Sequence, residues 1–515
     1  MFGLLSRRVY CVLSCLLLSL TVRGVDPLLS DLGLDSAAAR EVDQNKYTPA
    51  PPPSNPAQHA SAEGMPPLPL PAVSLRRTEK KNPPRPPVLI AKLASKKSHD
   101  WATNPADTKN LLKWMAKNLR VSFSEMNMPE DQIPSDPKGV PVLYKTGVKG
   151  FEFTPEQRKR LGEYLRGGGT LIMAAVCGST AFAESAVAEA RKLLPERAPH
   201  RLSKEHPLFH TYFDISEFKY RPQAIKAGAR NGDPGVIGVE LGCRTAILVF
   251  RWDISCGWDE QLDNSQMKCM GYDINVSKQI GANLMSYITS ERAVALPLSQ
   301  AMAFVDESKA RAGKFTIAQV KYNGIWKTRE AGISMLLNYF HEQTKTPVTF
   351  DREEVALTSN HLFDLPLVYM TGHDFFQFTP AERANLQRYL NQGGVLFAES
   401  CCGRTDFTAS FTHEMRQLFP SATLERLPAG HIIYRYPNNI TDVQPDPALA
   451  VRLKTKGRVA PELYGISIDG HLAVIFSPYG LSCGWELATC PYCGGIHSRD
   501  ALTLGINVLN YALLQ

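Results

Sequence analysis

The chain has 515 residues, which is too long for a single hydrophobic core and long enough for two domains of ordinary size. Its composition, 44% hydrophobic and 21% charged, is that of a globular protein. The formal charge is +7, but residues 76–97 alone hold eight basic side chains against one acidic side chain, so the rest of the chain is neutral. A nucleic-acid partner needs a basic face on a folded domain, and this charge balance argues against such a partner.

Residues 1–24 are typical of a secretory signal peptide. Arg7 and Arg8 precede an apolar run over residues 9–20, and residues 22–24 offer a small-residue cleavage site. The apolar run is too short to span a membrane comfortably. We therefore expect an exported protein of the periplasm or the cell surface, with no membrane contact beyond this signal or an uncleaved anchor formed by it.

Residues 25–87 are expected to form a disordered, proline-rich linker. Thirteen prolines fall between Thr48 and Pro87, among alanines, serines and few large apolar side chains. Such a segment cannot bury enough apolar surface to offset the entropy lost on ordering it. A polyproline-like spacer is favoured over a proline-rich ligand for another domain.

A tandem duplication is the strongest signal in the chain. A shift of 225 residues places 101–206 on 326–431 without a gap. The matches include Trp101 with Trp326, Thr146-Gly147 with Thr371-Gly372, Phe153-Thr154-Pro155 with Phe378-Thr379-Pro380, Gly168-Gly169 with Gly393-Gly394, Cys177-Gly178 with Cys402-Gly403, and His206 with His431. We therefore predict two related domains, 88–292 and 312–515, joined by a linker over 293–311.

Both copies alternate apolar strands with helices. Strands are predicted at 88–93, 140–144 and 170–176 and again at 315–320, 365–369 and 395–400, with helices at 111–119 and 333–342. Thr154 and Thr379 each precede a proline and stand three residues before Gln157 and Glu382, which predicts a capped helix start. Asp469-Gly470 predicts a late hairpin turn. Continuous apolar strands separated by helices predict an α/β fold with a mostly parallel sheet covered on both faces.

The second copy resembles a known bacterial family. The motifs are Pro366-Leu-Val-Tyr-Met-Thr-Gly-His373, Phe378-Thr-Pro, Tyr389-Leu, Gly393-Gly394, Cys402-Gly403 and Leu504-Gly-Ile-Asn-Val-Leu-Asn-Tyr511. They are similar to those of the domain-of-unknown-function family numbered 4159, over 312–515 and more weakly over about 86–290. That family is similar in fold to class I glutamine amidotransferases, so the resemblance implies two tandem flavodoxin-like three-layer sandwiches. It implies no reaction, because none is established for the family.

Polar side chains follow two predicted strands of the second copy. They are His373 and Asp374 after one strand, and Glu399, Arg404 and Asp406 at or after the end of the next. Ligands of doubly wound sheets bind at the carboxyl ends of the strands, so we predict a binding cleft here. The first copy has Val148, Ala174, Ser179 and Ala181 in place of His373, Glu399, Arg404 and Asp406. If either copy holds a site, we expect it to be the second.

Cys402 is a candidate nucleophile, since the amidotransferase-like fold implies a cysteine at a strand-to-helix turn. His431 or His373 could act as its base, with Glu399 or Glu414 orienting the imidazole. The amidotransferase elbow, however, needs glycines around its cysteine, and this chain has Ser400 and Arg404 there. Cys177 and His206 also keep these positions in the first copy. A small buried cysteine and a hydrogen-bonding histidine are therefore the favoured interpretations.

The remaining cysteines allow three interpretations. Cys256 with Cys269, and Cys483 with Cys493, are candidate disulfides of an exported protein. Cys483, Cys490, Cys493 and His497 have a spacing that suits tetrahedral zinc, although the first copy has no counterpart of Cys490. The Cys490-Pro-Tyr-Cys493 spacing also matches a glutaredoxin-type redox motif, which belongs to a different fold.

The sequence therefore favours an exported, non-catalytic protein without a cofactor. We expect the first copy to pack on or regulate the second, and the second to bind a small or polymeric ligand. Envelope proteins could be further partners. The alternative is a cysteine-dependent amidase or amidotransferase-like hydrolase, and a purely structural envelope component is a third hypothesis.

Overall fold

The structure, a computed structural model, describes residues 86–514 apart from 261–268, 293–314, 350–352 and 488–489. The predicted signal peptide, nearly all of the proline-rich linker and the 293–311 linker lie outside the described residues. Pro84–Gln515 forms one compact unit. Among the helices of the described segments, none has the length and apolar character that a membrane crossing requires.

The first repeat is a seven-stranded sheet with helices between its strands. Its elements are β1 (Val88–Ala94), α4 (Asp107–Leu119), β2 (Ser124–Pro129), β3 (Val142–Gly147), α5 (Pro155–Arg166), β4 (Thr170–Ala175), α6 (Thr180–Leu193), β5 (His200–Arg201), α7 (Pro222–Lys226), β6 (Val236–Leu241), β7 (Arg244–Phe250), α8 (Ser255–Trp258) and α9 (Ile274–Glu291). The strand order is β2-β1-β3-β4-β7-β6-β5. The strands from β2 to β7 in this order are parallel, and β6 and β5 add an antiparallel edge.

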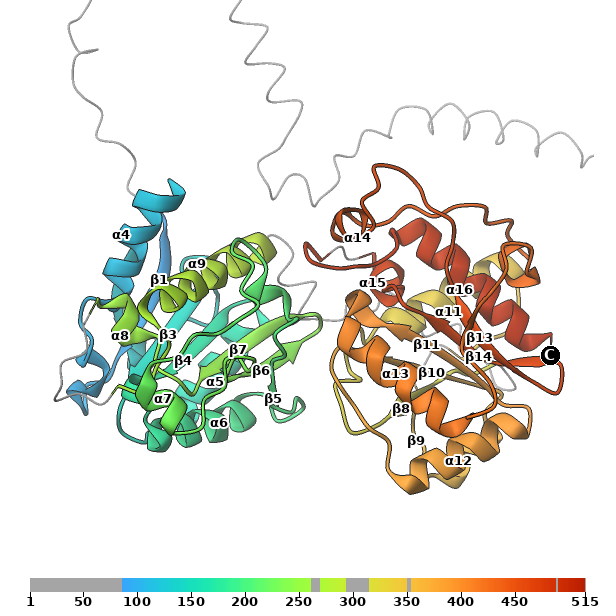
Figure 1. The fold of residues 1–515 in the computed structure, drawn as a ribbon, viewed down its shortest axis with the longest axis horizontal. Coiled ribbons are helices and arrows are strands. Elements are labelled where there is room, and N and C mark those ends of the chain that lie inside the picture. Colours follow the sequence, from blue (N-terminus) through green and yellow to red (C-terminus); the bar gives the residue numbers. More distant parts are fainter. Residues whose placement is uncertain (1–85, 261–268, 293–314, 350–352, 488–489, 515) are drawn as a thin grey trace, which may run out of the picture. The chain divides into compact units, whose positions relative to one another are not determined.

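The second repeat has the same topology (Figure 1). Its elements are β8 (Ala318–Lys321), α11 (Gly332–Thr344), β9 (Glu353–Ala356), β10 (Leu367–Gly372), α12 (Pro380–Asn391), β11 (Val395–Ser400), α13 (Thr405–Leu418), β12 (Glu425–Arg426), α14 (Pro447–Arg452), β13 (Tyr464–Ile468), β14 (His471–Ser477), α15 (Ser482–Trp485) and α16 (Ser498–Leu513). The order β9-β8-β10-β11-β14-β13-β12 repeats that of the first sheet strand for strand. The parallel part follows the chain order 2-1-3-4-5, which is one of the two common doubly wound orders.

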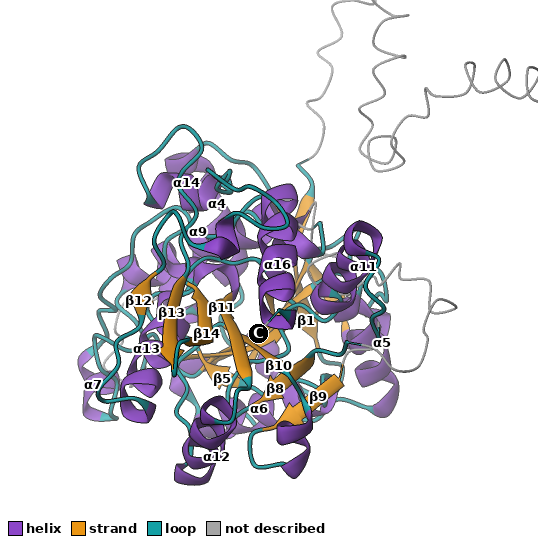
Figure 2. Ribbon diagram, turned by 90° about the vertical axis from the view of Figure 1, so that its right-hand side faces the viewer, coloured by secondary structure: helices purple, strands orange, loops and turns teal. Residues whose placement is uncertain are grey.

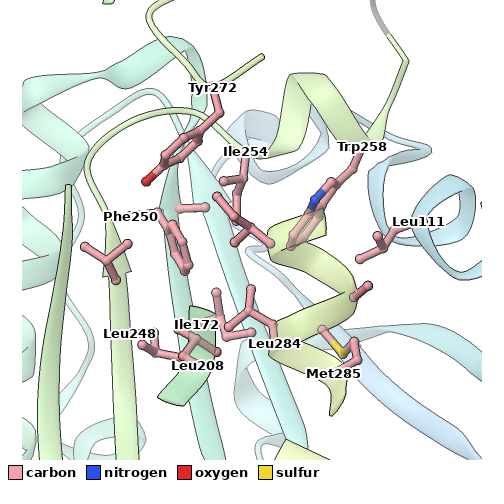
Figure 3. Packing of buried hydrophobic residues seen from close by; sticks show 14 of the residues in the cluster. Leu111, Ile172, Leu208, Leu248, Phe250, Ile254, Trp258, Tyr272, Leu284 and Met285 are labelled. Carbon is pink, nitrogen blue, oxygen red and sulfur yellow. The ribbon is translucent and has the colours of Figure 1, made fainter. Parts of the chain in front are cut away.

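Helices cover both faces of each sheet, as Figures 1 and 2 show. Successive side chains of a strand point to opposite faces. In β3, Val142 and Tyr144 join the core that includes α4 and α9, while Leu143 joins the core that includes α5 and α6. Figure 3 shows part of the first of these cores, with Leu111 of α4 and Leu284 of α9. The predicted pair of α/β domains with mostly parallel, two-sided sheets is confirmed.

The predicted helix starts and the predicted hairpin turn are also confirmed. The Thr154 hydroxyl accepts the Gln157 N–H, and the Gln157 side chain accepts the Thr154 N–H at 2.8 Å. Thr379 forms the same reciprocal cap at the start of α12. Asp469-Gly470, both with positive φ, forms the turn between β13 and β14.

The sheets differ from the prediction at several strand boundaries and at their edges. The strands predicted at 140–144 and 365–369 begin at Val142 and Leu367. The strand predicted at 315–320 begins at Ala318 instead, because Phe315 forms an isolated bridge with Val348. The edge strands β2 and β9 were not predicted. β2 has only one buried residue, Met128, so it lacks the continuous apolar run that marks the central strands.

Candidate functional site

A turn with left-handed backbone follows the fourth strand of each repeat. Cys177 has φ 54° after β4, and Cys402 has φ 55° after β11. This conformation is costly for a residue with a side chain, so it persists only where the surroundings impose it. Gly403 follows with φ 60°, and an added Cβ would lie 2.3 Å from the carbonyl oxygen of Gly494. The duplicated turn therefore holds both cysteines in one fixed backbone geometry.

In the second repeat this turn brings buried thiols together. The Cys402 sulfur lies 3.6 Å from that of Cys483, at the start of α15, and 3.9 Å from that of Cys401. The Cys243 sulfur, from the β6–β7 turn of the first repeat, lies 3.5 Å from that of Cys401 and 3.9 Å from that of Cys483. All four are buried. Cys490 and Cys493 belong to the same cluster.

The first repeat places three thiols and a carboxylate at the equivalent turn. The sulfurs of Cys177 and Cys256 are 4.0 Å apart, and the Cys269 thiol donates to Asp253 at 3.4 Å. Asp253 also accepts the backbone N–H groups of Cys177 and Cys256. Hydrogen bonds from Cys256 and Cys269 lower the pKa of Cys177 to about 4, while burial raises the pKa of Asp253 to about 7.

His373 lies directly after β10 and is fully buried. Its Nδ1 pairs with the carboxylate of Glu240 on β6. Its Nε2 has no hydrogen-bond partner among the described residues. Burial lowers the pKa of His373, but the charge of Glu240 and the contact with Cys243 outweigh it and raise this pKa to about 10.

Two of the three other predicted binding residues, Asp374 and Asp406, contact the first repeat. Asp374 Oδ2 lies 3.0 Å from Nε2 of His200. Asp406, which is only 6% exposed, accepts a hydrogen bond from the Ser203 hydroxyl. Arg404 has a buried Nε without a hydrogen-bond partner in the described chain. The structure thus brings the predicted polar side chains to one end of the sheet, where side chains of the first repeat meet them.

Glu399 links the strands of the second sheet to α15. Its carboxylate accepts the hydroxyls of Tyr369 at 2.6 Å and Thr371 at 3.0 Å. It also accepts the backbone N–H groups of Leu481 and Ser482 and the Ser482 hydroxyl. Burial raises the pKa of Glu399 above its ordinary value. A carboxylate with this many donors has a structural role in the sheet, and no contact within the described residues joins it to a histidine.

The predicted base His431 and its orienting residue Glu414 lie in other contacts. His431 Nδ1 accepts the N–H of Ile433 at 3.2 Å, and its ring packs on Tyr511. Glu414 forms a two-pronged ion pair with Arg383 at 2.7 and 2.9 Å. Within the described part of the chain, no contact joins either residue to Cys402.

The cysteines predicted to form disulfides are free thiols in the structure, namely Cys256, Cys269, Cys483 and Cys493. Of the predicted zinc set, Cys483 and Cys493 lie within 4.8 Å of each other and of Cys402. Cys490 and His497 are not members of that group. The sequence did not predict that Cys402 and Cys243 lie among the other thiols. The match of Cys177 with Cys402 between the repeats could have indicated this for Cys402.

A surface groove of about 680 Å³ lies beside the carboxyl ends of β8 and β10. Its lining is Asn323, Phe375, Phe376, Gln377, Ala409, Ser410, His413 and Glu414. The chain crosses from one side of the sheet to the other between these strands, which is where doubly wound proteins bind ligands. Phe375 is 62% exposed at this groove.

Comparison with known families and proteins matches one family model twice. The model is described as "Domain of unknown function (DUF4159)" and matches residues 89–289 and 316–513. No curated protein matches the chain. One solved structure, described as a "putative phosphosugar isomerase" from Silicibacter pomeroyi DSS-3, is similar at 10% identity over 61% of this chain and 75% of that chain, with a TM-score of 0.16. That TM-score supports no conclusion about fold or function. With two matches that together cover most of its length, the chain belongs to the DUF4159 family and carries its domain in tandem.

Proposed function

We propose that the protein is exported and non-catalytic, and that its second repeat binds a small or polymeric polar ligand. The observation that carries this proposal is the groove beside β8 and β10. An exposed aromatic ring, Phe375, stands there with the side-chain amides of Asn323 and Gln377 and the imidazole of His413. An apolar surface with a few polar groups is typical of ligand sites. A ring face flanked by amides suits the carbon and hydroxyl surfaces of a carbohydrate.

The surroundings of Cys402 support a non-catalytic function. A cysteine nucleophile must be a thiolate that a substrate can reach. Cys402 is 5% exposed. The sulfurs of Cys401 and Cys483 lie 3.9 and 3.6 Å from that of Cys402 and help to enclose it. A thiol that a substrate cannot reach is a poor nucleophile.

Contacts from the first repeat support a packing or regulatory role for that repeat. Glu240 pairs with His373, His200 lies against Asp374, and Ser203 donates to Asp406. His373 and Asp406 have apolar counterparts in the first repeat, Val148 and Ala181, and Asp374 has the oppositely charged Lys149. The need to bind the first repeat explains why these polar side chains occur in the second repeat.

Binding can be tested by thermal shift with a panel of mono- and oligosaccharides. A ligand that binds only the folded state raises the unfolding temperature in proportion to the logarithm of its concentration. We expect Phe375→Ala to abolish the shift. Tyr212→Ala removes an exposed aromatic ring of the first repeat and should leave the shift intact. If no saccharide stabilises the protein, or if both variants lose the shift equally, the proposed groove is not the binding site.

The alternative function, a cysteine-dependent amidase or amidotransferase-like hydrolase, is favoured by the left-handed turn at Cys402 before α13. Cys177 has the same backbone geometry in the first repeat. An electrophilic glutamine analogue distinguishes the two functions. The non-catalytic proposal predicts no labelling at neutral pH, whereas selective labelling of Cys402 that is lost in Cys402→Ser would establish the hydrolase.

A further inference from the structure

Each repeat gathers three cysteines at the same place in its fold. One stands on the left-handed turn, one begins the short helix α8 or α15, and one lies a little further along the chain. They are Cys177, Cys256 and Cys269 in the first repeat, and Cys402, Cys483 and Cys493 in the second. The sulfurs of each set lie within 4.8 Å of one another.

We propose that each repeat binds a zinc ion through these cysteines. In the first repeat the carboxylate of Asp253 completes a four-ligand set with the three thiols. In the second repeat two groups share Cys402: a three-thiol group with Cys483 and Cys493, and a complete four-ligand set with Cys243, Cys401 and His373. The ligand sets differ from the one that the spacing of Cys483, Cys490, Cys493 and His497 predicted.

The sulfur separations fit the edges of a metal tetrahedron. With zinc–sulfur bonds of about 2.3 Å, two sulfurs of a tetrahedral site are about 3.8 Å apart. The separations for Cys402–Cys483, Cys243–Cys401 and Cys177–Cys256 are 3.6, 3.5 and 4.0 Å. A disulfide needs about 2.05 Å and joins only two cysteines, whereas at least three converge in each repeat.

His373 supplies an independent observation. Its Nε2 is buried without a hydrogen-bond partner among the described residues, and one of its ring nitrogens lies within 4.8 Å of the sulfurs of Cys243, Cys401 and Cys402. A buried nitrogen without a partner is costly, and a metal ion would satisfy it. Its Nδ1 contacts the Glu240 carboxylate, and metal-binding histidines commonly hold a carboxylate in this way.

The charge around the second cluster is consistent with thiolates. Arg329 is 2% exposed, and only its Nη1 is paired, with Glu486 at 3.1 Å. Its Nε and Nη2 have no hydrogen-bond partner in the described chain. The sulfurs of Cys243 and Cys483 interact electrostatically with its guanidinium. Zinc bound by several thiolates carries excess negative charge, which a buried guanidinium offsets.

The closed surroundings identify the class of site. All ligands of the second cluster are buried, and only Cys177 of the first is partly exposed. Structural zinc sites are closed and four-coordinate, whereas catalytic ones keep an open position for water. The proposed ions therefore stabilise the fold of each repeat, and the proposal is independent of the ligand groove beside Phe375.

Elemental analysis of the full-length protein, purified without chelator, tests the proposal. We expect at least two zinc ions per chain. Cys177→Ser with Cys256→Ser should remove the zinc of the first repeat, and Cys402→Ser with Cys483→Ser that of the second. Cys490→Ser is the matched control, because Cys490 lies in the thiol cluster but outside both ligand groups. Zinc-free protein, iron with acid-labile sulfide in place of zinc, or equal zinc loss in the control would overturn the assignment.

A second measurement keeps the proposal testable if the serine variants fail to fold. Wild-type protein reloaded with cobalt(II) should show sulfur-to-cobalt charge-transfer absorption and the visible bands of tetrahedral coordination. Thiol titration in denaturant with chelator and without reductant should find all nine cysteines of residues 86–514 free. The loss of two thiols per repeat, with no cobalt–sulfur absorption, would instead establish the disulfides.

Discussion

At the residue scale, His206 and His431 occupy equivalent positions in the two repeats but are buried to different extents. His206 Nδ1 accepts the N–H of Leu208, as His431 Nδ1 accepts that of Ile433, both at 3.2 Å. His206 is 3% exposed, and its Nε2 lies 3.1 Å from the Thr245 hydroxyl. Burial lowers the pKa of His206 to about 4, against the opposing effect of nearby Glu240. His431 is partly exposed, and burial lowers its pKa as well.

The depressed pKa of His206 predicts a loss of stability in acid. The unfolded chain binds a proton near pH 6.5 and the folded chain only near pH 4, so the free energy of unfolding falls as the pH drops through this window. The slope contributed by this group is at most about 1.4 kcal/mol per pH unit. His206→Gln should reduce the slope measured by urea unfolding between pH 7 and 5, and His431→Gln should reduce it less. Equal slopes in wild type and His206→Gln would contradict the assignment.

At the element scale, the turn between β11 and α13 is fixed by close backbone packing. The N–H of Gly494 donates to the Cys402 carbonyl at 2.8 Å. Gly403 takes φ 60° in this turn, and Arg452 Nη1 donates to its carbonyl at 2.6 Å. The turn thus joins the fourth strand of the sheet to the segment that carries Cys490 and Cys493. Its geometry sets where the Cys402 thiol lies relative to the other sulfurs.

Gly403→Ala should therefore destabilise the second repeat. The new Cβ would lie 2.3 Å from a backbone oxygen and would require a left-handed conformation. We expect a loss of about 1–3 kcal/mol in the free energy of unfolding, by chemical denaturation. Gly457→Ala is the control, because an added Cβ there meets nothing within 4 Å. Similar stability of the two variants would show that the turn relaxes without cost.

At the scale of the whole molecule, the β6–β7 hairpin of the first repeat completes the site of the second. Glu240 near its end pairs with His373, and Cys243 in its turn contacts Cys401 and Cys483. Arg197 of the first repeat also donates to the Lys327 carbonyl and pairs with Glu330 of the second. Residues far apart in the sequence therefore share one buried cluster, and we expect the stability of the second repeat to depend on the first.

Glu240→Ala tests this dependence. It removes the carboxylate partner of a fully buried histidine, and breaking such a buried pair costs roughly 3–5 kcal/mol. Scanning calorimetry should show a lower unfolding temperature for the second repeat, although the substitution lies in the first. Glu205→Ala, at an exposed position of the first repeat, should leave the thermogram unchanged. An unaltered thermogram for Glu240→Ala would mean that the repeats unfold independently.

The features of the fold that could be predicted are those that depend on residues close together in the sequence. Apolar runs such as that at 395–400, and the caps at Thr154 and Thr379, depend on neighbours in the chain, so the sequence shows them directly. The edge strand β9 forms by pairing with β8, and no local sequence pattern indicates this pairing. The internal duplication marked Cys177 and Cys402 as equivalent, but Cys243 has no such signal, because its contacts are with the other repeat.

The sequence by itself therefore determined that two copies of one α/β sheet follow each other, because repetition and apolar periodicity are properties of the chain order. Only the tertiary structure decided what the polar cluster of the second copy faces. His373 meets Glu240 and the Cys243 thiol, which lie 133 and 130 positions earlier in the chain. The predicted open cleft is therefore an enclosed site. Charged groups and thiols that are removed from water need partners, and here they find them in one another or in an ion that they bind.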